Sequence, residues 1–290
     1  MRRHPHSPQA VMLFEWNTNM ATQPTHVDVS HRNNVHISGN PEGRTLVFGH
    51  GFGCSQEMWR GVTDSLAPDF QIVLFDHVGS GGSDLTQYDH GKYDSLHGYA
   101  ADILEIVGEL GLTDVVYIGH SVGAMMGVLA AVRDPASIAG LVLLSPSPCY
   151  INDGDYRGGF DQAELDALVD ALDMNYLGWA TAMAPVIMGN PDRPELGEEL
   201  TAQFCATDPV MARHFAEVVF LSDNRHDLTR VSTPTLIIQS QDDPIAPLHV
   251  GEYVHRKITG STFVVVPASG HCLNLSAPRQ VAAEIASYLR

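Results

Sequence analysis

Positive charge is scarce in this sequence. Its 290 residues include 16 Lys and Arg against 34 Asp and Glu, which gives a formal net charge of −18. A field of that sign repels the phosphate backbone of nucleic acids and the headgroups of anionic lipids. We therefore expect a partner that is neither a nucleic acid nor a membrane.

Cysteine is also rare. The four cysteines, Cys54, Cys149, Cys205 and Cys272, form neither a C-x-x-C pair nor a zinc-ligand spacing. The histidines and acidic residues do not fall at a recognised metal-ligand spacing either. We expect reduced thiols, a cytoplasmic location, and a protein that uses no metal and no cofactor.

Long apolar segments are missing as well. Arg2 and Arg3 are followed only by the apolar run of residues 11–14, which is too short for the core of a signal peptide or for a membrane span. Residues 1–25 show no apolar periodicity. We expect them to form an N-terminal extension that carries no chemistry.

Short apolar runs, in contrast, recur along the chain. Six of them stand out: TLVF at 45, IVLF at 72, VVYI at 115, LVLL at 141, TLII at 235 and FVVV at 263. Continuous apolarity over four residues is typical of strands that are buried on both faces of a parallel sheet. Two weaker segments, VDV at 27 and VHI at 35, predict an opening pair of strands.

Helix-length segments separate several of these runs. They cover residues 55–67, 96–110, 122–133, 248–257 and 278–289. Strands that alternate with helices predict an α/β fold with helices on both faces of the sheet.

The segment 148–232 differs because it contains no strand-like run. Leu165, Leu168, Val169 and Leu172 follow the i, i+3, i+4, i+7 spacing of an amphipathic helix. Helices inserted into an α/β chain most simply form a cap over the carboxyl edge of the sheet, where ligands bind.

A second helix is predicted inside this segment. Asp208 and Pro209 have the residue types of an N-cap and a first helical position, and the helix should end near Leu221. We expect residues 148–232 to be the cap, and residues 26–147 and 233–290 to be the core.

A G-x-S-x-G motif spans residues 119–123, between the run VVYI and an apolar helix. In such a turn the nucleophile takes an unfavourable backbone conformation, and Gly119 and Gly123 remove the collisions that side chains would cause. Taken alone, the motif also fits a serine that only caps a helix. Its context decides between the two interpretations.

A serine hydroxyl needs a base, and the base needs an orienting acid. In this strand–turn–helix geometry both follow the serine, the acid first, each in a loop after a later strand. Asp242 and Asp243 follow TLII, and His271 follows FVVV. Of the 15 histidines only His271 fits this order, and the spacing from Pro247 favours Asp243 over Asp242.

Two loops follow the first two strong runs. The loop HGFG at 50–53 can approach the serine closely, so we expect the backbone N–H groups of Phe52 and Val122 to stabilise an oxyanion. The second loop, VGSGGSD at 78–84, is rich in glycine but is not G-x-G-x-x-G. We predict an ordinary loop there rather than a dinucleotide site.

With these residues placed, the chain resembles the α/β-hydrolase superfamily, and within it the RsbQ-like regulators and the plant karrikin and strigolactone receptors. The likeness runs from about residue 27 to the C-terminus. It is carried by the stretches HGFGCSQEMW, VLFDHVGSGGSD, GHSVGAMMGVLA, SPSPCYINDGDYRGGF, NYLGWAT, FCATDPVMARHF, FLSDNRHDL and SGHCLNLSAP.

The resemblance implies an α/β-hydrolase fold with an eight-stranded, mostly parallel sheet under a four-helix cap. It also implies a triad of Ser121, Asp243 and His271, with Phe52 and Val122 as oxyanion donors. The residues at the positions of the family's pocket wall, as the resemblance implies them, are Phe52, Tyr150, Phe160, Trp179, Met183 and Phe220. Met183 stands where the family pattern often has an aromatic residue.

Three functions are compatible with this site. The first is a serine hydrolase, esterase-like or lactonase-like, for a small apolar ester or butenolide-type lactone. The second, implied by the resemblance, is a ligand-dependent signalling protein with slow or coupled hydrolysis, whose cap docks a partner protein. The third uses the same triad for carbon–carbon bond cleavage or a peroxidase-like side reaction.

Overall fold

The computed structural model describes residues 28–290 of the chain. The extension expected at residues 1–25 therefore lies outside the described residues. In the described part no helix combines the length and the apolar character that crossing a bilayer requires.

A seven-stranded sheet forms the centre of the described chain, in the order β1-β3-β2-β4-β5-β6-β7. Its strands are β1 (His36–Gly39), β2 (Thr45–Gly49), β3 (Gln71–Leu74), β4 (Val116–His120), β5 (Gly140–Leu144), β6 (Thr235–Asp242) and β7 (Thr262–Ser269). Strand β1 pairs antiparallel with β3, and the other neighbours are parallel. Each of the six strong apolar runs lies in one parallel strand, and the mostly parallel α/β architecture is confirmed.

One expected strand is not formed. The VDV segment was predicted to open the sheet, but Asp28 and Val29 instead begin the short helix α1 (Val29–Arg32). The side chain of Asp28 accepts a hydrogen bond of 3.2 Å from the backbone N–H of His31, which caps this helix. The described residues thus contain seven sheet strands instead of the expected eight, because a local cap outweighs the β-propensity of valine.

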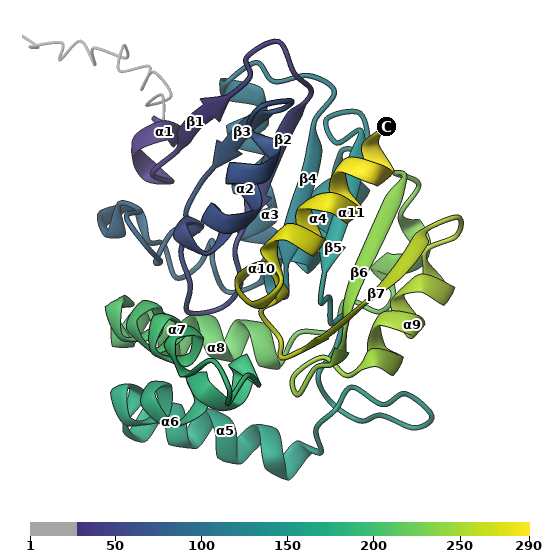
Figure 1. The fold of residues 1–290 in the computed structure, drawn as a ribbon. Helices are drawn as coiled ribbons and strands as arrows, with labels where there is room; N and C mark the ends of the chain where they lie inside the picture. The colour runs from purple at the N-terminus through teal and green to yellow at the C-terminus, as the bar shows by residue number, and fades with distance from the viewer. Residues whose placement is uncertain (1–27) are drawn as a thin grey trace, which may run out of the picture.

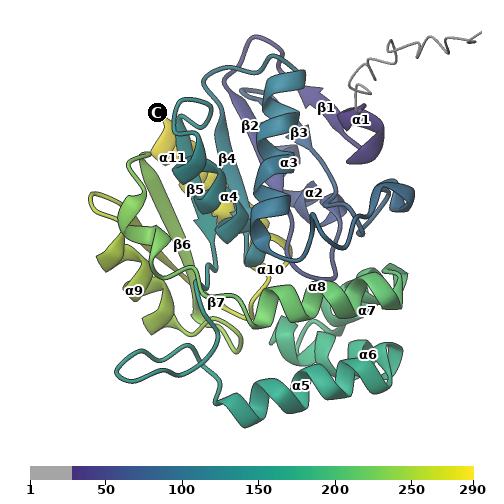
Figure 2. The same ribbon diagram turned by 180° about the vertical axis from the view of Figure 1, so that it is seen from behind.

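Helices cover both faces of the sheet (Figures 1 and 2). One face carries α2 (Arg60–Leu66), α10 (Leu273–Ser276) and α11 (Pro278–Leu289), and the other carries α3 (Leu96–Glu109), α4 (Val122–Arg133) and α9 (Leu248–Lys257). Short 3₁₀ segments, Gln56–Trp59, Leu85–Gln87 and Asp227–Arg230, lie in the connections. The central strands are buried on both sides, which explains their continuous apolar sequence.

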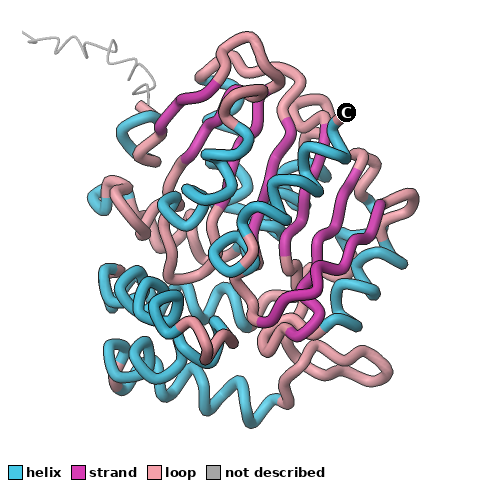
Figure 3. Tube along the Cα trace, viewed as in Figure 1, coloured by secondary structure: helices cyan, strands magenta, loops and turns pink. Residues whose placement is uncertain are grey.

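Four helices between β5 and β6, together called the cap below, lie beyond one end of the sheet, at the bottom of Figure 1. They are α5 (Gln162–Met174), α6 (Tyr176–Met188), α7 (Pro194–Ala206) and α8 (Pro209–Phe220). Figure 3 shows this part of the chain as helix and loop. Asp208 caps α8 by accepting hydrogen bonds from the N–H groups of Val210 and Met211, as its residue type predicts.

Candidate active site

Ser121 lies in the sharp turn between β4 and α4. Its backbone has φ 55° and ψ −121°, a conformation that costs a side-chain-bearing residue about 1–3 kcal/mol. Its N–H donates to the carbonyl oxygen of Leu144 at 2.9 Å, which ties the turn to the neighbouring strand β5. A Cβ on Gly123 would lie 2.5 Å from the carbonyl oxygen of His50, so only glycine lets α4 begin this close to the end of β2.

The imidazole of His271 lies against this serine. Its Nε2 is 2.8 Å from Ser121 Oγ, although the two residues are 150 positions apart in the chain. Its Nδ1 lies 3.0 and 2.9 Å from the two carboxylate oxygens of Asp243. Because Nδ1 donates to the carboxylate, Nε2 carries the lone pair and accepts the serine hydroxyl proton. All three side chains are buried.

The two candidate acids, Asp242 and Asp243, have different surroundings in the structure. Asp243 Oδ1 accepts hydrogen bonds from the backbone N–H groups of Ile245 and Ala246, at 2.8 and 2.9 Å, so the carboxylate is fixed in a tight turn. The neighbouring residue, Asp242, is exposed at the end of β6. The position next to the histidine is therefore taken by Asp243, which the spacing favoured.

Two backbone N–H groups are free beside the serine. Within residues 28–290, neither the N–H of Phe52 nor that of Val122 donates to another protein atom. Val122 is the first residue of α4, where helix N–H groups have no partner inside the helix. A Cβ on Gly51 would come within 3.4 Å of Ser121 Cβ, so the loop that carries Phe52 packs directly on the serine. Two unpaired N–H groups beside a nucleophile are the kind of donors that an oxyanion hole requires.

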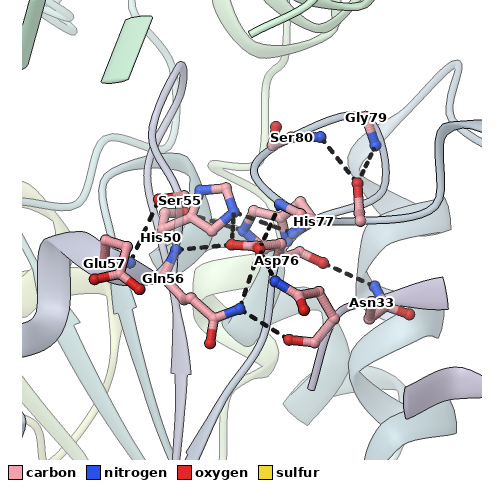
Figure 4. Close-up of polar contacts among 12 residues, drawn as sticks. Asn33, His50, Ser55, Gln56, Glu57, Asp76, His77, Gly79 and Ser80 are labelled. Atoms are coloured by element: carbon pink, nitrogen blue, oxygen red, sulfur yellow. Dashed lines mark hydrogen bonds and ion pairs between the residues drawn. The ribbon is translucent and has the colours of Figure 1, made fainter. Parts of the chain in front are cut away.

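A buried polar network holds this loop in place (Figure 4). The Asp76 carboxylate accepts hydrogen bonds from the backbone N–H of Gln56 at 2.8 Å, from the Gln56 side chain at 3.0 Å and from the N–H of Gly82 at 2.8 Å. It also accepts from the Asn34 side chain at 2.8 Å. One carboxylate thereby connects the loop after β2 with the glycine-rich loop after β3. The second loop consists of turns, and its Gly82 N–H helps to hold the Asp76 carboxylate.

Two histidines complete the network. His50 Nε2 accepts from the backbone N–H of His77 at 3.0 Å, and His77 Nε2 donates to the carbonyl oxygen of His50 at 3.0 Å. His50 Nδ1 donates to the carbonyl oxygen of Gly51 at 2.9 Å. Burial lowers the pKa of His50 and holds the pKa of His77 well below its usual range. Two uncharged imidazoles thus fix the backbone next to Phe52.

A small cavity opens above the serine. Five of the six residues expected in the pocket line it: Phe52, Tyr150, Trp179, Met183 and Phe220. About 40 Å³ of this cavity is open to the centres of water molecules. That is room for about three waters, since one water needs about 10–15 Å³ by this measure.

Phe160 lies outside the lining of this cavity. It is half-buried in a loop, where its backbone pairs with Tyr150 and Asn152. Matching its position to the family pattern does not show where this side chain lies, because the loop folds back and pairs with its own backbone. Lining residues that the sequence reasoning missed include Cys54, Leu168, Ile187, Phe204 and Cys272.

The ring of Phe52 projects from the core into the cap. Its centroid lies 5.7–6.1 Å from the rings of Trp179, Phe204, Phe215 and Phe220. Aromatic pairs at such distances stabilise each other beyond the area that they bury. The side chain of Phe52 therefore joins the loop after β2 to helices α6, α7 and α8.

Comparison with known proteins identifies the family. A model described as "Alpha/beta hydrolase family" matches residues 46–284, most of the chain. The chain belongs to this family. The expected α/β-hydrolase fold is thereby confirmed.

Individual relatives of this alpha/beta hydrolase are similar over most of their length. A karrikin insensitive 2 receptor of Petunia hybrida is 38% identical over 86% of this chain and 93% of its own. A strigolactone esterase of Arabidopsis thaliana is 35% identical over the same shares. The solved structure of a hydrolase from Oleispira antarctica has a TM-score of 0.87 at 40% identity, and the match covers 90% of this chain and 96% of that one. The resemblance to the plant receptors is confirmed.

The cap of the hydrolase also contacts the loop of His271. The backbone N–H of His271 donates to the carbonyl oxygen of Ile187, in the last turn of α6, at 2.9 Å. Asn190 Nδ2 donates to the carbonyl oxygen of Ser269 at 2.9 Å. A Cβ on Gly270 would collide with the carbonyl oxygen of Met188, at 1.8 Å. The end of α6 is thus joined to the histidine loop by its backbone.

The polar support of the site was missed at the sequence level. His50, Asp76, His77 and His120 are all buried and all follow or end a strand at the carboxyl edge of the sheet. Polar residues directly after apolar strand runs were the available signal. Their partners lie far away in the chain, so the pattern alone does not show which side chains meet.

Proposed function

We propose that the chain is a serine hydrolase that cleaves a small, uncharged ester or lactone through an acyl-enzyme. The observation that carries this proposal is the distance of 2.8 Å between His271 Nε2 and Ser121 Oγ, with the opposite ring nitrogen bonded to Asp243. A hydroxyl, a base and an orienting acid in this order are the parts that activate a serine.

In the first half-reaction, Ser121 Oγ attacks the carbonyl carbon while its proton passes to His271 Nε2. The carbonyl oxygen becomes an oxyanion that accepts hydrogen bonds from the N–H groups of Phe52 and Val122. Asp243 stabilises the imidazolium and keeps the ring oriented. The carbon–oxygen bond of the ester then breaks, and His271 returns its proton to the leaving alkoxide.

In the second half-reaction, water replaces the alcohol. His271 takes a proton from the water as it attacks the acyl carbon, and the same N–H groups stabilise the second oxyanion. The bond to Ser121 Oγ breaks and the proton returns to the serine. When the substrate is a lactone, the leaving hydroxyl stays attached to the acyl chain throughout, and the product is a single hydroxy acid.

The cavity supports a small, uncharged substrate. None of the residues that line it is Lys or Arg, so a carboxylate or phosphate would find no cationic partner there. Most of the lining is aliphatic, aromatic or sulfur-containing, and such side chains bind apolar groups by burying them. The ester hydrolases among the relatives support the same reaction class.

The test replaces the nucleophile. Ser121→Ala should lower kcat on p-nitrophenyl acetate by about 10⁶-fold, because the triad acts as a unit. Ser30→Ala, at an exposed position on α1, is the matched control and should match the wild type. Intact-protein mass spectrometry with a fluorophosphonate should show one adduct on the wild type and on the control, and none at this site in Ser121→Ala. Esterase activity that survives in Ser121→Ala would contradict the proposal.

A second function is favoured by the contact between α6 and the His271 loop, because the carbonyl of Ile187 would sense any movement of the histidine. Relatives that are named as receptors add support. In this function acylation changes the cap, and the signalling partner expected there recognises the change. Hydrogen exchange over residues 185–193 should differ between the free protein and the fluorophosphonate adduct, and identical exchange in both would contradict this role.

A further inference from the structure

His120 occupies a position between two loops of the site. It is the last residue of β4, directly before Ser121, and its side chain is buried. Its Nε2 lies 3.0 Å from the carbonyl oxygen of His271, which is 151 positions away in the chain. Since a carbonyl only accepts, Nε2 carries the proton and donates it.

The ring of His120 is packed on two sides. Its centroid lies 4.9 Å from that of His271, with the planes tilted by 52°. On another side, a Cβ on Gly51 would come within 2.6 Å of His120 Nδ1. The imidazole thus fills the space between the loop at residues 50–53, called the oxyanion loop below, and the loop that carries His271. Neither loop can move toward the other.

The second nitrogen of this ring is unusual. Among the described residues, His120 Nδ1 has no hydrogen-bond partner although it is buried. An unpaired polar atom in this position costs about 1–3 kcal/mol. Burial, followed by the neighbouring His271, lowers the pKa of His120 to about 3. The ring therefore stays neutral at pH values well above 3, and it adds no positive charge beside His271.

The backbone of His271 is held from two directions. Its carbonyl oxygen accepts from His120, which belongs to the core, and its N–H donates to Ile187, which belongs to the cap. The side chain between these two groups makes its own bonds to Ser121 and Asp243. Fixing the backbone on both sides leaves the imidazole little freedom to leave the serine.

We propose that His120 is a positioning residue that holds the His271 loop so that Nε2 stays within hydrogen-bond distance of Ser121. This inference rests on the proposed hydrolase function. The residue before the nucleophile thus has a role in addition to filling space in the core. The donated hydrogen bond, and not the ring, performs this role.

Two substitutions separate the hydrogen bond from the ring. His120→Gln places an amide N–H close to the position of Nε2 and keeps the donor, whereas His120→Phe keeps a ring of similar shape and loses the donor. His120→Phe should lower kcat on p-nitrophenyl acetate by about 100-fold with little change in KM, because a displacement of 1 Å in a reacting group has effects of this size. His120→Gln should restore kcat to within about fivefold of the wild type.

If His120 only filled space in the core, kcat and the denaturation midpoint would fall together in a variant that disturbs the packing. His120→Phe removes the unpaired Nδ1 but also leaves the carbonyl oxygen of His271 without its donor. These two effects on stability oppose each other and are of similar size. The denaturation midpoint should therefore stay close to that of the wild type while kcat falls. His255→Phe and His255→Gln are the matched controls, because His255 also pairs through a ring nitrogen, with Ser261 at 2.8 Å, and stacks on Phe263. Both controls should keep the wild-type kcat. Equal kcat in the two His120 variants would overturn the proposal.

A readout that needs no turnover completes the test. The low-field proton NMR signal of the hydrogen bond between His271 and Asp243 should be present in the wild type and in His120→Gln, and shifted or lost in His120→Phe. An unchanged signal in His120→Phe would overturn the positioning role even if the protein hydrolyses no ester. A wild type without esterase activity contradicts the proposed function alone, and the NMR comparison still decides the role of His120.

Discussion

Two helices beside the site, α4 and α5, are surrounded very differently. In α4, ten of the 12 residues are buried, from Val122 to Ala131. In α5, only Leu165 and Leu172 of the 13 residues are buried. A residue of α4 has neighbours on every side, so a change of one methylene is felt there. A residue of α5 contacts the protein along one stripe, and most changes meet solvent.

The residues that line the cavity also differ between the cap helices and the core. Every cavity-lining residue from helices α5–α8 is apolar: Leu168, Trp179, Met183, Ile187, Phe204, Val219 and Phe220. Ser121, His120 and His271 come from the core, and the one further hydroxyl in the lining, that of Tyr150, lies in the loop between β5 and α5. We infer that the core determines how fast the bond is broken, and that the cap determines which molecule is bound. Substitutions in the two regions should therefore change different kinetic constants.

After the loss of the nucleophile itself, the largest core effect should come from the acid. Asp243→Asn should lower kcat by about 10⁴-fold, because an amide favours the wrong tautomer of His271 and cannot stabilise the imidazolium. Asp242→Asn is the matched control in the adjacent, exposed position and should keep kcat within about threefold. Steady-state kinetics on p-nitrophenyl acetate checks both. A larger loss in Asp242→Asn than in Asp243→Asn would contradict the geometry of the site.

The next effect tests the oxyanion loop. In Gly51→Ala the new Cβ would lie 2.6 Å from His120 Nδ1, so the loop must move and carry the N–H of Phe52 with it. The loss of one oxyanion donor costs about 10²–10³-fold in kcat. KM should change little, since the oxyanion forms only in the transition state.

Gly108→Ala is the control for this substitution. An added Cβ at Gly108, in α3, meets nothing within 4 Å, so the change should raise stability by about 0.5–1 kcal/mol and leave kcat alone. Affinity for a boronic acid, which imitates the tetrahedral oxyanion, should fall in Gly51→Ala and not in Gly108→Ala. Unchanged boronate affinity in Gly51→Ala would place the donor elsewhere.

Acid should weaken the core through its buried histidines. Burial lowers the pKa of His50, His77 and His120, the last from 6.5 to about 3. Below pH 6.5 the unfolded chain therefore binds protons that the folded protein does not, and the free energy of unfolding falls as the pH falls. Each such histidine contributes a slope of about 1.4 kcal/mol per pH unit until its folded pKa is reached.

His120→Gln isolates one of these contributions. Between pH 6 and pH 4 the free energy of unfolding of this variant should decrease less steeply than that of the wild type, by about 1.4 kcal/mol per pH unit. Urea unfolding at three pH values measures the two slopes. Equal slopes would mean that His120 gains a proton in the folded protein, and would contradict its assignment as a neutral donor.

The sequence predicts the core better than the cap for a physical reason. Strands that are buried on both faces must be apolar throughout, so the runs at residues 45, 115, 141 and 235 mark β2, β4, β5 and β6 directly. The runs at 72 and 263 mark β3 and the edge strand β7, which are only partly buried. The order of Ser121, Asp243 and His271 follows from that topology, because each lies at the carboxyl end of a strand. The contacts among these three side chains follow from the fold for the same reason.

Local competition and long-range pairing account for the failures. The segment at residue 27 was expected as a strand because of its valines, but Asp28 caps a helix there. Phe160 was carried over by position, and no periodicity reports which way a loop residue points. The pairing of Gln56 with Asp76 and of His120 with His271 depends on packing between distant segments, which one sequence does not display.

The smallest effect should come from the cap, and it should change selectivity instead of rate. Met183 is half-buried and lines the cavity from α6, so Met183→Ala enlarges a site that holds about three waters. The variant should raise kcat/KM for p-nitrophenyl hexanoate by about tenfold relative to the acetate, since one to two buried methylenes are worth this much. Met174→Ala, which changes a side chain exposed to 82% on the outer side of the cap, should leave the ratio unchanged. If Met183→Ala instead lowered kcat on the acetate as strongly as Gly51→Ala, the cap would share in bond breaking, and the division between the two regions would be wrong.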